Sequence, residues 1–178
     1  MPVKPSCPFQ PSHAPGVLVV QSFTHRTLPQ QLLKARDALM AHFRPILKHY
    51  GVTEQQWRIL RALAQELQLE PHELCELCQI LSSSMAGILA RMEETGLVQR
   101  IRVETDQRRL QVRLTPKADA LIEEMSALIE VQYQYLEQSW GARPLEALLG
   151  ALEDFIAAQA MPAQRVALPP PRLNTDPA

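Results

Sequence analysis

The order of the elements in the middle of the chain constrains its fold more than any other feature of the sequence. A proline in a favoured first-turn position begins a short helix over residues 71–78. A serine triplet begins a longer helix over residues 82–96, and the first of these serines, Ser82, can cap it. Two strands follow at 97–103 and 110–114. A short helix, a tight turn, a longer helix and a two-stranded ribbon together indicate a winged helix-turn-helix.

Helical patterns flank this lobe, which covers residues 53–114. Apolar side chains recur at helical spacing before it, over residues 26–52, and after it, over residues 115–160. Thr115 followed by Pro116 is a typical helix start. The sequence therefore predicts a mainly α fold, in which a winged helix-turn-helix with a two-stranded β-wing lies between two helical regions in the chain order.

The two ends of the chain have a different composition. Residues 1–25 are rich in proline and serine and predict a flexible N-terminal arm, and the proline-rich residues 161–178 predict a disordered tail. The sequence has no apolar run of the roughly 20 residues that span a bilayer, and its start lacks a secretory signal core. Its three cysteines follow no disulfide spacing. We therefore expect a cytoplasmic protein with reduced thiols and no membrane partner.

Charge is unevenly distributed along the chain. The formal net charge is only −1, but residues 97–117 contain six basic and two acidic side chains, whereas residues 118–159 contain one basic and eight acidic side chains. A phosphate backbone would be attracted by the first segment and repelled by the second. The basic excess surrounds the predicted wing and its polar turn at 104–107, and it favours double-stranded DNA as a partner.

The helix over residues 82–96 has one apolar side that can anchor it and a second side of small and basic residues. Small hydroxylated residues at a helix N-terminus allow the backbone to approach a base edge or a phosphate, which the helix dipole also attracts. An arginine further along can reach a base, and arginines beside the wing turn can enter the minor groove. Capping and solvation would explain each residue alone, but their joint order favours DNA binding. The predicted DNA-binding residues are Ser82, Ser83, Ser84, Gly87, Arg91, Arg108 and Arg109.

Several segments resemble one known family. Residues 106–115, with the sequence Asp-Gln-Arg-Arg-Leu-Gln-Val-Arg-Leu-Thr, are similar to the wing signature D-x-R-x-x-x-V-x-L-T of the MarR family of transcriptional regulators. Residues 87–93 and 96–98 resemble the recognition helix and the first wing strand of that family. The resemblance covers about residues 28–158, and the long N-terminal arm and the proline-rich tail depart from it.

Within the family, residues 43–46 and 53–59 resemble most closely the branch that controls homoprotocatechuate degradation. The resemblance implies a homodimer whose dimerisation region is formed by residues 26–52 and 115–160, and a pseudo-palindromic operator. It also implies that Asp106 supports the geometry of the wing through an ion pair. The expected function is therefore a ligand-responsive transcriptional repressor.

A basic residue on the apolar stripe of the first helix suggests where a ligand binds. Arg36 lies between Leu32 and Phe43 on that stripe, where a guanidinium must find an anion or emerge to solvent. A structural salt bridge is one interpretation, and a clamp for a small aromatic carboxylate from a catabolic pathway is the other. A hydroxylated phenylacetate or a pyridine carboxylate would fit, and the family places ligands near this region. The candidate ligand-binding residues are Arg36, Met40, Phe43, Trp57 and Arg58.

Two alternatives remain open at this point. His72, Cys75 and Cys78 recur every three residues, which would suit a redox- or metal-responsive regulator, but no second Cys/His pair completes a zinc site, so no metal is expected. The other alternative is a winged-helix module that binds only proteins, against which the basic wing argues. The sequence contains no catalytic motif and no phosphate-binding loop, so we expect neither an enzyme nor a cofactor.

Overall fold

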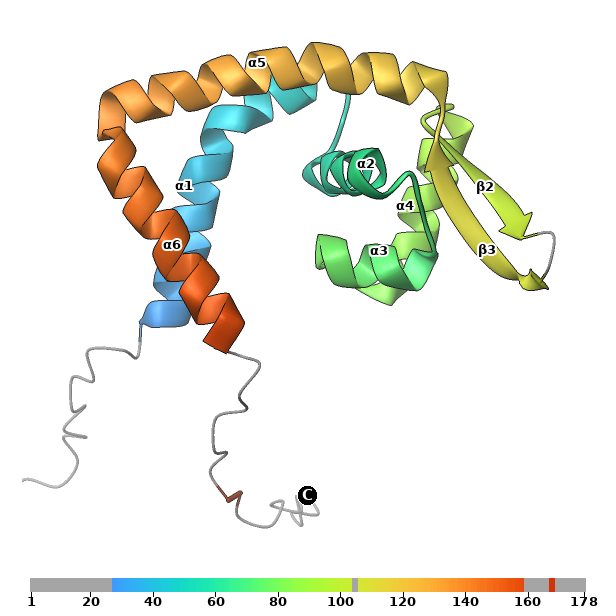
Figure 1. Cartoon of the computed structure of the whole chain (residues 1–178), viewed down its shortest axis with the longest axis horizontal. Coiled ribbons are helices and arrows are strands. Elements are labelled where there is room, and N and C mark those ends of the chain that lie inside the picture. Colours follow the sequence, from blue (N-terminus) through green and yellow to red (C-terminus); the bar gives the residue numbers. More distant parts are fainter. Residues whose placement is uncertain (1–26, 104–105, 159–166, 169–178) are drawn as a thin grey trace, which may run out of the picture. The chain divides into compact units, whose positions relative to one another are not determined.

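The computed structural model describes residues 27–103, 106–158 and 167–168 (Figure 1). The chain divides into two compact units, and the boundary between them lies between Ala41 and His42. The helices are α1 (Leu28–His49), α2 (Glu54–Glu66), α3 (Pro71–Cys78), α4 (Ser82–Glu94), α5 (Pro116–Trp140) and α6 (Ala142–Ala158), and the strands are β1 (Gln68–Leu69), β2 (Val98–Val103) and β3 (Asp106–Leu114). The predicted arm and most of the predicted tail lie outside the described residues. The expected functional boundaries at 52 and 114 stay a prediction.

The predicted fold class is confirmed, with one addition. The wing strands belong to a three-stranded antiparallel sheet of order β1-β3-β2, because the short strand β1 pairs with the inner end of β3. A strand of two residues is too short to show any alternation in the sequence. The start of β3 at Asp106 also corrects the expected polar turn, because Val103 pairs with Asp106 after an irregularity in the ladder.

Local capping explains where the helices begin and end. Thr53 caps α2 through a reciprocal pair of bonds: its backbone N–H donates to the Gln56 side chain at 2.9 Å, and its hydroxyl accepts from the Gln56 N–H at 3.2 Å. Gly51, at φ +66°, ends α1 in a left-handed conformation that a side chain would disfavour. One expectation is wrong, because the N-cap of α4 is Leu81 and Ser82 is already helical.

The core of the second unit is built from α2, α3, α4, the sheet and the start of α5 (Figure 1). Interdigitating aliphatic side chains from these elements exclude water, which is the main stabilising contribution to folding. The largest fully buried side chains are Ile59, Leu60, Leu63, Leu74, Met85, Leu89, Met92, Val98, Val112 and Met125. This core fixes α4 and the root of the wing on one rigid lobe. No described helix is both long enough and apolar enough to cross a membrane.

Candidate nucleic-acid interface

The two faces of α4 differ in the way that the sequence predicted. Four apolar side chains, at 0–3% exposure, anchor the inner face, and these are Met85, Ile88, Leu89 and Met92. The outer face is exposed and carries the predicted residues Ser82, Ser83, Ser84, Gly87 and Arg91. The structure therefore brings the small and basic residues of α4 together on one accessible surface.

Leu81 at the N-cap gives α4 an uncapped first turn. The amides at the start of a helix have no intrahelical acceptor, and a leucine side chain has no atom that could accept from them. Amides in this position bind phosphate oxygens when a helix end meets DNA. The corrected cap therefore agrees with the expectation that the backbone at the start of α4 approaches a phosphate, and that contact stays a prediction.

Gly87 and Arg91 lie one above the other on the outer face. A Cβ atom placed on Gly87 would lie 3.8 Å from Nη1 of Arg91, which is an ordinary contact distance. The Arg91 guanidinium therefore extends back along the helix over Gly87. Since the backbone of Gly87 is helical, glycine is not needed there for its conformation, and the absence of a side chain leaves this part of the surface flat.

The basic residues of the wing have different partners. Arg100 on β2 donates through Nε to the Glu93 carboxylate at 2.7 Å and so ties β2 to the end of α4. These hydrogen bonds lower the pKa of Glu93 below its ordinary value. Arg113 donates to the Gln99 side chain at 3.1–3.2 Å across the β2–β3 ladder. These arginines therefore contribute to the internal structure of the lobe as well as to its charge.

Arg109 has a partner that the sequence analysis did not consider. Its Nε donates to Oε1 of Glu70 at 2.7 Å, and its Nη2 contacts the same oxygen. Glu70 directly precedes Pro71 at the start of α3 and is the N-cap residue of that helix. The side chains of Asp106 and Arg108 lie outside what the structure describes, so the predicted wing support and the predicted minor-groove contact stay predictions.

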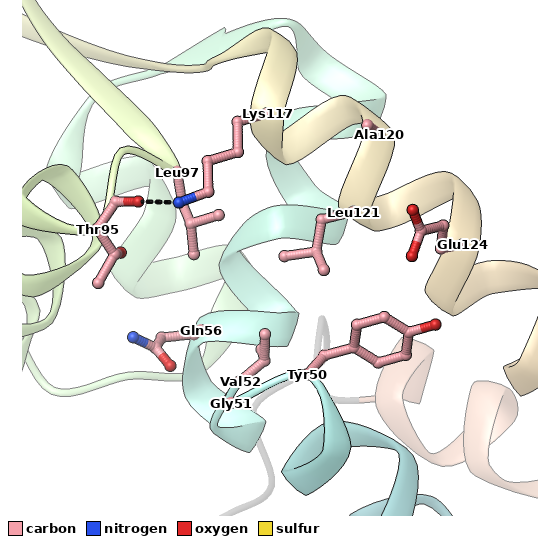
Figure 2. Close-up of a pocket in the computed structure, with 10 residues that line it drawn as sticks. All are labelled: Tyr50, Gly51, Val52, Gln56, Thr95, Leu97, Lys117, Ala120, Leu121 and Glu124. Atoms are coloured by element: carbon pink, nitrogen blue, oxygen red, sulfur yellow. Dashed lines mark hydrogen bonds between the residues drawn. The ribbon is translucent and has the colours of Figure 1, made fainter.

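Polar bonds fix the junction between α4, the sheet and α5. The Thr115 hydroxyl donates to the Gly96 carbonyl at 2.7 Å, and the Lys117 ammonium donates to the Thr95 carbonyl at 2.7 Å. Figure 2 shows the hollow of about 420 Å³ beside this junction, with the apolar side chains of Val52, Leu97 and Leu121 among its walls. Its two charged side chains, Lys117 and Glu124, have opposite signs, so it offers no net attraction for an anion.

A second hollow, between α2 and α3, has a different electrostatic character. It has a volume of about 230 Å³, and two arginines, Arg58 and Arg61, line it together with one glutamate, Glu66. Arg58 donates through Nη1 to the Cys78 carbonyl at 2.6 Å, while its Nε is buried and has no hydrogen-bond partner among the described residues. A third hollow contains one arginine and two acidic residues. Of these three hollows, only the one at Arg58 and Arg61 has an excess of positive charge.

The other predicted ligand residues do not gather in one described place. Phe43 is buried and packs on the Tyr133 ring at a centroid distance of 4.8 Å, and Trp57 is 9% exposed, so both belong to the packed interior. Arg36 and Met40 belong to the N-terminal unit. Arg36 is exposed there, and Leu32, its neighbour on the stripe, is 37% exposed. A ligand role for these residues stays a prediction.

The environment of the two cysteines of α3 favours a structural role over a redox or metal-binding role. Cys78 is buried and Cys75 is half-buried. Burial raises the pKa of the Cys78 thiol, an effect that nearby Arg58 opposes and nearby Cys75 reinforces. Nδ1 of His72 lies 3.5 Å from Glu70, and within the described ranges no three His, Cys, Asp or Glu side chains gather as a metal site would require. A raised thiol pKa disfavours the thiolate that redox chemistry needs.

A short helix, a second helix with an exposed polar face and a basic β-ribbon define the class of winged helix-turn-helix proteins. Residues 50–109 match the family model described as MarR family. The chain is 43% identical over 133 residues to the homoprotocatechuate degradative operon repressor of Escherichia coli, and this match covers 75% of the chain and 90% of that protein. The chain therefore belongs to the MarR family of transcriptional regulators.

Two solved structures are similar along most of their length. The transcriptional regulator PA4135 has 41% identity and a TM-score of 0.70, with 73% of this chain and 96% of that chain covered. NadR in complex with 4-hydroxyphenylacetate has 33% identity and a TM-score of 0.68, with 75% and 97% covered. These matches confirm the family resemblance and the fold class. Because the family and these relatives are regulators, the expectation that the protein is not an enzyme is confirmed as well.

Proposed function

We propose that this protein is a homodimeric repressor that binds pseudo-palindromic operator DNA and is released by a small aromatic carboxylate. The outer face of α4 is the observation that carries the DNA-binding part. Its polar residues are exposed while its apolar residues are buried, so the helix is anchored on one side and accessible on the other. A helix of this kind enters the major groove in winged helix-turn-helix complexes.

Binding of the protein to DNA from upstream of its own coding region tests this part. Fluorescence anisotropy should show saturable binding that weakens steeply as salt rises, because phosphate contacts release counterions. Arg91→Gln should weaken binding by roughly 5–150-fold, the range for loss of a base contact. Arg143→Gln, an exposed change on α6, is the matched control and should bind as the wild type does. Absence of DNA binding even at low salt would favour the protein-interaction module instead.

Apolar side chains on α6 support the proposed homodimer. Four large side chains of this helix are at least half exposed in the single chain, and these are Leu148, Leu149, Phe155 and Ile156. Exposed apolar surface of this kind is typical of a face that another protein covers. A second copy of the chain is the partner that a two-fold operator requires, because each half-site then meets one recognition helix.

The hollow at Arg58 and Arg61 is our proposed site for the carboxylate of the effector. Its excess positive charge attracts an anion, and Arg58 retains one donor, Nε, that has no hydrogen-bond partner among the described residues. Its volume of about 230 Å³ lies below the ~300–1,000 Å³ of sites for drug-sized ligands and suits a single ring. The relatives support an aromatic acid, since one is named for homoprotocatechuate degradation and another was solved with 4-hydroxyphenylacetate.

Release of DNA by a panel of aromatic acids, including 4-hydroxyphenylacetate, tests the effector site. A ligand acts only through its different affinities for the DNA-binding and released states, and a coupling of roughly 1–3 kcal/mol gives a 5–150-fold effect. Arg61→Gln removes an exposed cation from the hollow and should raise the acid concentration needed for release without changing DNA affinity. If Arg61→Gln has no effect while Arg36→Ala abolishes the response, the clamp is at Arg36 instead.

A further inference from the structure

An ion pair links the start of α3 to the strand that carries the wing. Oε1 of Glu70 accepts from Nε of Arg109 at 2.7 Å and also contacts Nη2 of the same guanidinium, although the two residues are 39 positions apart. The Glu70 side chain is 16% exposed, so most of the carboxylate is shielded from water, while the Arg109 side chain is 57% exposed. The Glu70 carboxylate is therefore largely shielded from water, and the ion pair is not a contact between two fully solvated side chains.

The position of this pair continues the short ladder between β1 and β3. The last backbone partners of that ladder are Leu69 and Val112. In an antiparallel register Glu70 then faces residue 111, and Arg109 lies two residues further toward the wing tip on the same face. The ion pair therefore holds β3 beyond the point at which the backbone hydrogen bonds to β1 end.

Glu70 is also close in sequence to the helix that presents the DNA-binding surface. It directly precedes α3, and only residues 79–81 separate α3 from α4. Its own backbone N–H donates to the Glu73 carboxylate at 2.7 Å, which secures Glu70 at the start of the helix. Arg109 is therefore attached to the start of a helix that leads into α4, and not to a loop.

We infer that Glu70 is a positioning residue for the wing, and that Arg109 clamps β3 to the start of α3 and does not contact the operator. This inference rests on the proposed DNA binding. The Nε and Nη2 groups form one fork of the guanidinium, and this is the fork that recognises a phosphate or a guanine in a bidentate way. In Arg109 it is directed at Glu70. The sequence had assigned Arg109 to DNA.

The two possible roles of Arg109 predict opposite effects of Glu70→Gln. If Arg109 binds DNA and Glu70 merely competes for it, removing the carboxylate charge frees the guanidinium and removes a repulsion of phosphate, so that binding tightens. If Glu70 positions the wing, the weaker neutral contact lets β3 move relative to α4, and binding weakens. The sign of the change therefore separates the two roles without reference to its size.

Anisotropy titrations of the full chain on its upstream DNA, at several salt concentrations, provide the test. Glu70→Gln and Arg109→Gln should each weaken DNA binding by roughly fivefold. The double variant should bind DNA as tightly as the single variant with the lower affinity, because the two substitutions break the same contact. The salt dependence of binding by Arg109→Gln should equal that of the wild type, because a guanidinium that stays on Glu70 releases no counterion from the phosphates. Tighter binding by Glu70→Gln, additive effects or a reduced slope in Arg109→Gln would overturn the inference.

Hydrogen exchange in the DNA-free protein provides a second readout that does not depend on the proposed function. The backbone amides of residues 106–112 should exchange faster in both Glu70→Gln and Arg109→Gln than in the wild type, while those of α5 should not change. Unchanged exchange in the wing would overturn the positioning role even if the wild type bound no DNA. A wild type that fails to bind DNA, with the expected exchange in both variants, would instead reject the proposed function alone.

Discussion

The helices α4 and α6 are both amphipathic, but they complete their packing in different ways. α4, with 13 residues, buries four large apolar side chains to 3% exposure or less. α6, with 17 residues, has no buried side chain in the described chain, and Ile156 on it is 68% exposed. The two sequences show the same kind of apolar periodicity, so the difference does not arise from the helices themselves.

The difference lies in what the rest of the chain offers to each helix. α4 packs on α2, α3 and β2, which surround its apolar face, whereas the described packing of α6 is on α5. Each Å² of apolar surface left in water forgoes about 25 cal/mol. The comparison teaches that neighbouring elements of the same unit cover the apolar face of α4, whereas the apolar side chains of α6 are exposed in the described chain, and we propose that a second copy covers them.

The largest expected effect is on the stability of the lobe and concerns the buried face of α4. Met92→Ala removes a side chain of α4 that is fully buried, and it should lower the free energy of unfolding by about 2–5 kcal/mol through lost burial and the remaining cavity. Urea unfolding followed by circular dichroism measures this loss. Leu67→Ala, at a side chain that is 81% exposed, is the control and should change stability by no more than about 0.5 kcal/mol. An equal loss in both variants would remove the distinction between core and surface.

The second effect is on the affinity of the proposed dimer and concerns the exposed apolar side chains of α6. Phe155→Ala on α6 truncates a side chain that is 50% exposed in the single chain and that the proposed dimer would bury. The dissociation constant of the dimer should rise by roughly tenfold or more, as for an interface aromatic residue. Sedimentation equilibrium over a range of protein concentrations measures this constant, with Glu153→Gln on the same helix as the control. A monomer at every concentration in the wild type would contradict the proposed partner of α6.

A third effect tests the junction where the lobe passes into α5. Thr115 is 8% exposed, its hydroxyl donates to the Gly96 carbonyl, and it also caps α5 by accepting from the Ala118 N–H at 3.2 Å. Thr115→Ala should cost about 1–2 kcal/mol of unfolding free energy, because it removes the cap of α5 and leaves the part-buried Gly96 carbonyl without this donor. Thr115→Ser keeps the hydroxyl and should recover most of the loss in the same urea titration. A loss in the serine variant equal to that of alanine would assign the effect to the methyl group.

The smallest effect is a pH dependence at the end of α4. The Arg100 guanidinium holds the pKa of Glu93 below its ordinary value of 4.5. A lowered pKa in the folded state contributes stability above pH 4.5, and this contribution is lost as the pH falls through the folded-state pKa. Glu93→Gln should therefore lose less thermal stability than the wild type between pH 5 and pH 3. Parallel melting curves across that range would contradict the contribution of this pair.

Features that depend on near neighbours in the chain could be predicted. The start of α2 at Thr53, the start of α5 at Thr115 and the two-sided character of α4 all follow from residues within one or two turns of each other. The same local reasoning placed Arg91 on an exposed face. It was wrong about the cap of α4, because the helix begins one residue earlier than a capping Ser82 would allow, with Leu81 at the N-cap and no side-chain cap.

Features that join distant segments could not be predicted in this way. The partner of Arg109 is 39 positions away, and the sequence near Arg109 carries no sign that Glu70 would meet it. The buried Nε of Arg58 likewise depends on α3 closing over α2. The sequence therefore assigned Arg109 to DNA without any sign of the carboxylate that its guanidinium contacts, and its role at the operator stays a prediction.

The sequence by itself determined the family, the order of the elements and which face of α4 is polar, because periodicity, capping and motif spacing are local properties of the chain. Only the tertiary structure decided that β1 adds a third strand, that Arg109 of β3 meets Glu70, and that α6 buries none of its side chains within the described part of the chain. These outcomes depend on which surfaces meet after the helices have formed. That choice is made by the packing of the whole lobe, and no single segment encodes it.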